Sequence, residues 1–206
     1  MSAAAPWIRN LGLVAYEPTV RAMRDYTRTR DDESRDQVWL LEHPPVFTLG
    51  LAGRAAHVLA AGDIPVVKTD RGGQVTFHGP GQVVAYLLLD LRRQGIGVKE
   101  LVRRLEQAVI ELLAGYGIAG VRRPGMPGVY VGEAKIAAVG LRVSRGCTYH
   151  GISVNVDGDL TPFSRIDPCG YPGLGVTRLA DLGVRDSISA VQQKLAAALK
   201  RCLTPT

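Results

Sequence analysis

What this 206-residue sequence has little of already excludes several classes of protein. Its three cysteines, Cys147, Cys169 and Cys202, form no CxxC pair, so neither a disulfide framework nor a zinc site is expected. This scarcity fits a reduced, cytoplasmic setting best. The apolar run at residues 83–89 is far shorter than the roughly 20 residues of a membrane-spanning helix, and the N-terminus has no secretion signal.

Aromatic residues are also scarce, at 6% of the chain, and the net charge is only moderately positive, at +6. The basic residues are scattered and no nucleic-acid-binding motif accompanies them, so binding to nucleic acid is not expected. With 46% hydrophobic and 21% charged residues, the composition is typical of a globular protein. The positive charge favours an acidic partner without identifying one.

No repeat or Ser/Gly-rich linker divides the chain, so residues 1–206 are expected to form one domain. Apolar residues recur at helical spacing over residues 98–114, and Gly115 and Gly117 follow, which predicts a helix that ends there. Ser187 is the expected N-cap of a C-terminal helix. A third helix is predicted from Pro18 to about Arg30. The apolar stripe of the C-terminal helix comprises Val191, Leu195, Ala198, Leu199 and Cys202.

Strands are predicted between these helices. The pattern of residues 83–89 is typical of a strand buried on both faces, and Pro44-Pro45 ends the strand before it. Three later segments are expected to form a meander. The predicted strands are residues 38–42, 83–89, 129–131, 135–143 and 150–156. Strands mixed with helices in irregular order predict an α+β fold, with a mixed β-sheet flanked by helices.

Residues 71–82 form the segment richest in candidate ligand contacts. Four glycines and a proline would let the backbone approach a ligand, and Arg71, Thr76 and His78 add hydrogen-bond donors. The segment has neither the Lys-Ser/Thr pair of a P-loop nor the GxGxxG of a dinucleotide site. The alternative interpretation is a glycine-rich hairpin without a ligand.

Residues 163–170 are the second candidate, because the neighbours Pro168 and Gly170 predict a turn at Cys169. A single cysteine is most often a buried hydrophobe, and a nucleophilic one needs a cation or donor nearby. Lys135 opens an apolar strand, where partial desolvation would suit it to act as a base. The alternative is a solvated lysine at a strand edge. His78 and His150 are further candidates for hydrogen bonding at the site.

Four motifs, at residues 71–82, 135–140, 150–156 and 167–170, occur in this order. Together they closely resemble the lipoyl(octanoyl) transferase family, over about residues 38–182. The resemblance implies a fold similar to the catalytic domain of biotin and lipoate protein ligases, with a cleft for an acyl chain. Phe77, Leu87 and Arg178 depart from the family pattern, in which Tyr, Pro and Ser are usual, so differences in loop shape and pocket hydrogen bonding are expected.

The resemblance also implies a Cys/Lys dyad, in which Cys169 accepts the acyl group and Lys135 activates it. It implies no metal and no cofactor. Three segments would form the walls of the substrate site. The implied substrate-binding residues are Arg71, Gly72, Gly73, Gln74, Val75, Thr76, Phe77, His78, Ala138, Val139, Gly140, His150, Gly151, Ile152 and Ser153.

The implied reaction is octanoyl transfer from octanoyl-acyl carrier protein, through a thioester on Cys169, to the lysine of apo lipoyl domains. These acceptors would be the lipoyl domains of 2-oxoacid dehydrogenase complexes and the glycine cleavage H protein. Both protein substrates are expected to be acidic. Candidate contacts for them are Arg92, Arg93, Arg103, Arg104, Arg122, Arg123, Arg142 and Arg145.

Three other functions stay open at this stage. An ATP-dependent lipoate or biotin ligase would keep the glycine-rich segment and Lys135 but would not need Cys169. A Cys-His hydrolase would use Cys169 with His78 or His150 and would need no lipoyl domain. A nucleic-acid-binding protein is suggested by the pI near 9.5 alone.

Overall fold

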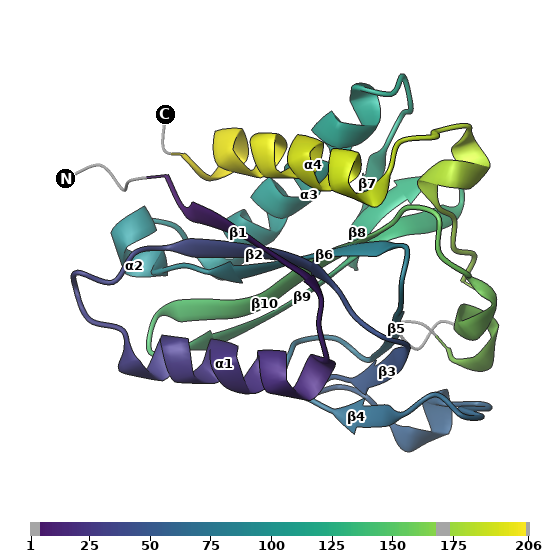
Figure 1. Ribbon diagram of the computed structural model, residues 1–206, viewed down its shortest axis with the longest axis horizontal. Coiled ribbons are helices and arrows are strands. Elements are labelled where there is room, and N and C mark those ends of the chain that lie inside the picture. Colours follow the sequence, from purple (N-terminus) through teal and green to yellow (C-terminus); the bar gives the residue numbers. More distant parts are fainter. Residues whose placement is uncertain (1–4, 168–173, 205–206) are drawn as a thin grey trace.

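Two β-sheets form the framework of the protein (Figure 1). The computed structural model describes residues 5–167 and 174–204. The larger sheet has the strand order β1-β2-β6-β10-β9-β8-β7, and the smaller sheet has the order β4-β3-β5. The strands are β1 (Trp7–Leu13), β2 (Gln37–Glu42), β3 (Val46–Leu49), β4 (Val66–Lys68), β5 (Val75–His78), β6 (Gln82–Leu88), β7 (Val121–Arg123), β8 (Met126–Val131), β9 (Ala134–Ser144) and β10 (Cys147–Asn155).

Helices cover both faces of the larger sheet. In Figure 1, α3 (Val98–Ala114) and α4 (Ile188–Leu203) lie on one face, and α1 (Tyr16–Thr29) lies on the other. The smaller sheet adjoins the start of α1, where the Tyr16 hydroxyl hydrogen-bonds with Thr69 at 3.1 Å. The remaining short elements are α2 (Leu91–Gln94), η1 (Ala55–His57), η2 (Thr161–Arg165) and η4 (Leu179–Leu182).

The structure confirms the predicted fold class and most predicted elements. Helix α3 has the predicted bounds, and the Ser187 hydroxyl caps α4 by accepting a hydrogen bond from the Ala190 N–H. Helix α1 begins two residues before Pro18. Strands β8, β9 and β10 form the predicted antiparallel meander, and every residue of β6 is buried. The sheet is mixed, because β1 pairs with β2 in parallel and the other neighbouring strands are antiparallel.

The sequence interpretation missed β1, β7 and the whole smaller sheet. Strand β1 is mostly exposed and shows no clear alternation of apolar and polar residues, which is the pattern that identifies a strand. The interpretation of residues 71–82 as a hairpin is wrong. Strand β5 pairs with β3 in the smaller sheet, whereas β6 lies in the larger sheet between β2 and β10. This segment therefore crosses from one sheet to the other.

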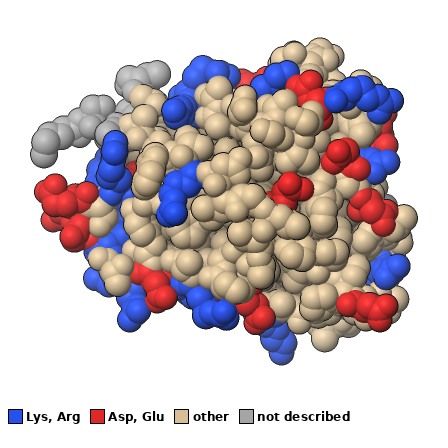
Figure 2. Space-filling view, viewed as in Figure 1, with Lys and Arg blue, Asp and Glu red and all other residues tan. Residues whose placement is uncertain are grey.

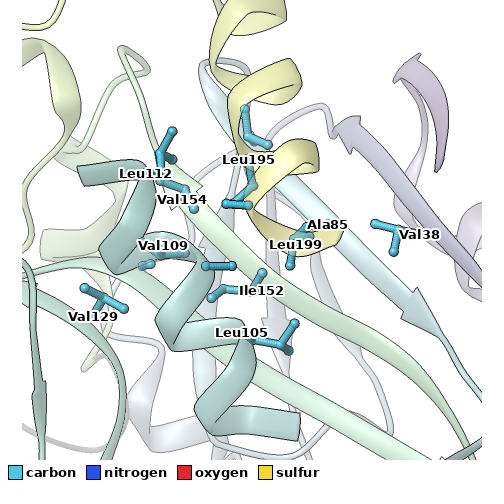
Figure 3. Packing of buried hydrophobic residues seen from close by; sticks show 14 of the residues in the cluster. Val38, Ala85, Leu105, Val109, Leu112, Val129, Ile152, Val154, Leu195 and Leu199 are labelled. Carbon is cyan, nitrogen blue, oxygen red and sulfur yellow. The ribbon is translucent and has the colours of Figure 1, made fainter. Parts of the chain in front are cut away.

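The main hydrophobic core lies between the larger sheet and helices α3 and α4 (Figure 3). Ile152 and Val154 of β10 face Leu105 of α3 and Leu199 of α4, and all four side chains are almost completely buried. Burying one such side chain contributes about 1.5–3 kcal/mol. This face of the sheet therefore contributes a large part of the stability of the fold.

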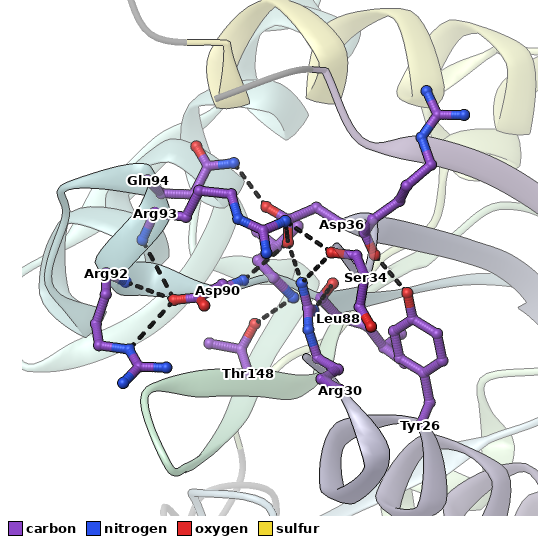
Figure 4. A network of polar contacts seen from close by, with 12 residues as sticks. Tyr26, Arg30, Ser34, Asp36, Leu88, Asp90, Arg92, Arg93, Gln94 and Thr148 are labelled. Carbon is purple, nitrogen blue, oxygen red and sulfur yellow. Dashed lines mark hydrogen bonds and ion pairs between the residues drawn. The ribbon is translucent and has the colours of Figure 1, made fainter. Parts of the chain in front are cut away.

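A buried polar network joins the end of α1 to β6 and α2 (Figure 4). The Arg30 guanidinium donates to the Asp36 carboxylate at 2.5 Å, and both side chains are only 3% exposed. Arg30 also donates to the Leu88 carbonyl, while Asp36 accepts from the Asp90 N–H and the Gln94 amide. Removing one partner of a buried ion pair destabilises a protein by about 3–5 kcal/mol. A shift of β2 against β6 would break this network, so the network fixes the register of the two strands at their ends.

Candidate active site

A cavity lies on the face of the larger sheet opposite α3 and α4. It encloses about 520 Å³ of empty space, including its open mouth. The larger sheet, the start of α1 and the glycine-rich segment form its walls. All the predicted substrate-binding residues except Gly72 and Phe77 line this cavity, which is called the acyl pocket below after the acyl-chain cleft that the family resemblance implies. The sequence interpretation missed three further lining residues, Tyr16, Val84 and Tyr86, because nothing in the sequence places these segments beside the motifs.

The two predicted residues that do not line the acyl pocket have structural contacts instead. The Gly72 N–H donates to the Leu141 carbonyl at 2.8 Å, which fixes the glycine-rich segment against β9. A Cβ at Gly140 of β9 would lie 2.9 Å from the Gly72 carbonyl oxygen, so this close approach requires glycine. The Phe77 ring packs between Phe47 and Phe163, with centroid distances of 5.6 Å to each.

Lys135 is buried at 5% exposure, so the interpretation of a solvated edge lysine is wrong. Its Nζ donates to the Pro127 carbonyl at 3.3 Å and lies 5.2 Å from the centroid of the Tyr130 ring. Lys135 lines a smaller cavity next to the acyl pocket, and Thr76, Ala138 and Ser153 line both. Lys135 therefore lies at one end of the acyl pocket.

A β-bulge in β9 places Lys135 on the pocket face. Val129 of β8 pairs with Ala137 and Tyr130 pairs with Lys135, so Ile136 is an extra residue on β9. Ile136 and Ala137 both belong to the hydrophobic core on the helix side. Without the extra residue, strand alternation would put Lys135 on the same face as Ala137, away from the pocket.

A left-handed residue in β10 alters the other end of the pocket. His150 has φ of +60°, which is rare for a residue other than glycine and costs about 1–3 kcal/mol. Regular alternation would put His150 on the core face with Ile152. Instead Tyr149 and His150 both reach Asp70: the Tyr149 hydroxyl donates to one carboxylate oxygen at 2.5 Å, and His150 Nε2 lies 3.0 Å from the other.

Asp70 is ionised and fixes the tautomer of His150. Partial burial tends to raise the pKa of the Asp70 carboxyl, but hydrogen bonds from His150, Arg24 and Tyr149 outweigh this and hold the pKa well below its usual range. Burial lowers the pKa of His150, although Asp70 partly opposes that shift. Neutral His150 therefore donates through Nε2, and its buried Nδ1 has no hydrogen-bond partner among the described residues.

Two more buried histidines are neutral: His78, which lines the pocket, and His43, which lies behind Tyr86. Burial lowers the pKa of His78 to about 3 and that of His43 to about 4. His43 Nδ1 lies 2.7 Å from the Val14 carbonyl, so it carries the proton, and Nε2 accepts from the Tyr86 hydroxyl at 2.7 Å. His78 Nδ1 lies 2.7 Å from the Gln82 side-chain oxygen and donates to it. The sequence alone gave no indication of His43.

The predicted nucleophile, Cys169, lies outside the described residues. The other two thiols are poorly suited to nucleophilic attack, since burial raises the pKa of Cys147, and burial together with Glu111 raises the pKa of Cys202 to about 11. The segment that starts at residue 174 pairs with the backbone of Lys135. The Lys135 N–H donates to the Gly175 carbonyl at 2.8 Å, and the Lys135 carbonyl accepts from the Thr177 N–H at 3.0 Å.

The candidate arginines are not gathered at the pocket. Two of the eight, Arg142 on β9 and Arg145 in the β9–β10 turn, come after Gly140 in the sequence, in the direction of the pocket end at His150. The other six lie on α2, α3 and β7. Figure 2 shows basic and acidic side chains interspersed over the face that it presents. In the part of the chain that the structure describes, no group of three His, Cys, Asp or Glu side chains could hold a metal ion. None of the described helices is long and apolar enough to cross a membrane.

Comparison with known families identifies the class of protein. Residues 17–200 match the model of the lipoyl protein ligase A/B catalytic domain, so the chain belongs to this family. Within it, the chain is 60% identical over 196 residues to an octanoyltransferase of Thiobacillus denitrificans, which covers 95% of this chain and 90% of that protein. The family prediction made from the four sequence motifs is therefore confirmed.

Solved structures show the same fold at low sequence identity. Lipoate-protein ligase A bound with ATP has a TM-score of 0.77 at 16% identity, covering 97% of this chain and 86% of that one. A biotin protein ligase from Aquifex aeolicus, in complex with biotin and ATP, has a TM-score of 0.62 at 16% identity, covering 96% and 70%. The predicted likeness to the catalytic domains of these ligases is confirmed at the level of the fold.

Proposed function

We propose that this protein transfers an octanoyl group from octanoyl-acyl carrier protein to the lysine of apo lipoyl domains, through a thioester on Cys169. The identity of 60% to an octanoyltransferase over almost the whole chain supports octanoyl transfer. The observation that carries the mechanism is the position of Lys135. It is a buried amine at one end of an acyl-sized pocket, paired along its backbone with the segment that follows Cys169.

The first step is thioester exchange. The Cys169 thiolate attacks the thioester carbonyl of the donor, the bond from the acyl carbon to the carrier sulfur breaks, and the carrier leaves as a thiol after taking up a proton. Lys135 in its ammonium form stabilises the attacking thiolate and supplies that proton. Because one thioester replaces another, this step is near thermoneutral and requires no ATP.

The second step forms the amide. The lysine amine of the acceptor domain attacks the acyl-enzyme, a C–N bond forms, and the Cys169 sulfur leaves as a thiolate. Lys135, now a neutral amine, takes the proton that the acceptor nitrogen loses. The two protonation states of one buried lysine therefore serve the two steps in turn. Lipoyl domains of 2-oxoacid dehydrogenase complexes and the glycine cleavage H protein are the proposed acceptors, and residues 1–206 act as one catalytic domain.

The acyl chain occupies the pocket next to Lys135. Ala138, Gly140 and Gly151 are small, which leaves room above the sheet, while Val75, Val84 and Val139 provide apolar contact. Each buried CH₂ contributes about 0.8 kcal/mol, so an eight-carbon chain gains several kcal/mol of binding free energy without a charged contact.

The decisive experiment is intact-mass measurement after mixing the protein with octanoyl-acyl carrier protein alone. We expect a single octanoyl adduct, and peptide mapping should place it on Cys169. Cys169→Ala should abolish both the adduct and transfer, whereas Cys147→Ala and Cys202→Ala are matched controls that should keep them. An adduct on Cys147 or Cys202, or normal turnover by Cys169→Ala, contradicts the proposed nucleophile.

The same fold serves ATP-dependent ligases, so the cosubstrate distinguishes the second candidate function. A ligase would attach free octanoate or lipoate only when ATP is present. We expect transfer from the carrier thioester to a purified apo lipoyl domain with no nucleotide added. Product that forms only from free acid and ATP contradicts the proposal. Release of free octanoate in the absence of a lipoyl domain would indicate a hydrolase instead.

A further inference from the structure

We propose that Tyr86 and His150 form a fixed wall at the far end of the acyl pocket, and that this wall limits the acyl chain to about eight carbons. The inference rests on the proposed function and adds the residues that select the length of the chain. Tyr86 and His150 both line the pocket and are almost completely buried.

The strand register gives the length of the pocket. Ser153 of β10 lies at the end next to Lys135, where it lines both cavities, and it pairs with Ala138 and Val84. His150 lies three residues away along the same strand. At about 3.3 Å per residue, this separation is roughly 10 Å. An extended octanoyl chain, with seven carbon–carbon bonds, covers about that distance from its carbonyl to its methyl group.

Hydrogen bonds to surrounding elements hold the two wall residues. The Tyr86 hydroxyl donates to His43 Nε2, and His43 is itself anchored on the Val14 carbonyl. His150 Nε2 donates to Asp70 at 3.0 Å. The Tyr86 and His150 rings meet edge to face, with centroids 5.8 Å apart and planes at 82°. Neither ring can turn aside for a longer chain without breaking a buried hydrogen bond.

The left-handed backbone at His150 is part of the same construction. With regular alternation the imidazole would lie on the core side of the sheet, and the pocket would continue past Gly151. The φ of +60° brings the ring to the pocket face, where Asp70 holds it. Asp70 in turn accepts hydrogen bonds from Tyr149 and from Arg24, at 2.5 and 3.0 Å. Three residues, Asp70 directly and Tyr149 and Arg24 through it, thus hold the His150 ring while its backbone is strained, which indicates a positional requirement.

The test measures a ratio of two donors, because a folding defect lowers both rates equally. Equimolar octanoyl- and decanoyl-acyl carrier protein compete for one apo lipoyl domain, and the mass of the product reports which acyl group was transferred. His150→Asn shortens the side chain, and asparagine tolerates the left-handed backbone. We expect the decanoyl share relative to octanoyl to rise about tenfold, the gain expected when two more methylenes find room.

Two further variants make the result decisive. Asp70→Ala removes the anchor of His150 and should shift the ratio in the same direction by a smaller factor. His57→Asn makes the same exchange at a histidine that does not line the acyl pocket, and it should leave the ratio unchanged. If His150→Asn does not fold, the decanoyl-to-octanoyl ratio of Asp70→Ala tests the proposal in its place.

If His150→Asn folds and still transfers octanoate with an unchanged decanoyl-to-octanoyl ratio, the proposal that Tyr86 and His150 limit the chain length is wrong. The proposed function would not be affected. A ratio that shifts equally in His57→Asn also contradicts the proposed limit on chain length. A wild-type protein that transfers no acyl group at all contradicts the proposed function itself.

Discussion

The two faces of the larger sheet differ although the same strands build both. On the helix side, Ile152, Val154 and Val156 follow the regular alternation of a strand and pack against α3 and α4. On the pocket side, the alternation is broken twice, by the bulge at Ile136 and by the left-handed His150. The regular face carries the largest buried cluster, whereas each irregularity moves one polar side chain to the opposite face. There His150 lines the acyl pocket and Lys135 lines the smaller cavity beside it. Four predictions test this division.

The largest effect is expected from Lys135 on the pocket face. Lys135→Met keeps a long side chain but removes the amine, and transfer should fall on the order of 10²- to 10⁴-fold, the usual contribution of a positioned acid or base. The variant should still fold, because methionine is apolar and close to lysine in volume, so it fills the same buried space. Assay of transfer beside a thermal melt checks both points, and transfer within tenfold of wild type would rule out the assigned role of Lys135.

On the helix face, the expected effect is on stability alone. Leu199 is completely buried, and Leu199→Ala should lower the free energy of unfolding by about 2–5 kcal/mol through the cavity it leaves. Transfer per folded molecule should match wild type. Urea unfolding and an assay at low temperature separate the two quantities. A loss of activity without a loss of stability would mean that the two faces are not independent.

A smaller effect concerns the pH dependence of stability. His43 and His78 have pKa values of about 4 and about 3 in the folded protein, against about 6.5 when unfolded. Below pH 6.5 the unfolded chain therefore binds more protons than the folded protein. The free energy of unfolding should decrease as the pH falls from 6.5 toward 4 and then 3. The slope is about 1.4 kcal/mol per pH unit for each histidine. Urea midpoints between pH 7.5 and 4 measure it, and His43→Gln should reduce the slope.

The smallest effect is expected at the rim of the pocket face. Arg24 pairs with Asp70 at 3.0 Å, but its side chain is 47% exposed. Arg24→Ala should therefore change stability by about 1 kcal/mol or less. Because Tyr149 and His150 still hold Asp70, transfer should stay close to the wild-type rate. A destabilisation as large as that of Leu199→Ala would show that the rim contributes as much as the core.

The sequence predicts the helix face well because that face follows simple periodic rules. The apolar spacing in residues 98–114 and the Ser187 cap were sufficient to place α3 and α4. Helix and cap patterns are local, so a single sequence contains them in full.

The pocket face is harder to predict, because its features depend on contacts between distant segments. Residues 135–140 read as an uninterrupted apolar strand, and nothing in them marks Ile136 as an extra residue until β8 is seen opposite. His150 shows no local sign of its positive φ, since Asp70, which holds it, is 80 residues away. Through a family resemblance, the motifs named segments that the structure brings together around one cavity. The roles of these residues, including that of Cys169, stay predictions.

The extra residue at Ile136 matters for anyone who compares or redesigns this strand. Point substitutions leave the number of residues in β9 unchanged, so they alter side chains but cannot exchange the two faces of the strand. Removing Ile136 would do so, and would turn the amine toward the helices. The spacing of this short segment therefore matters as much as its composition, and an alignment gap placed there would misplace Lys135.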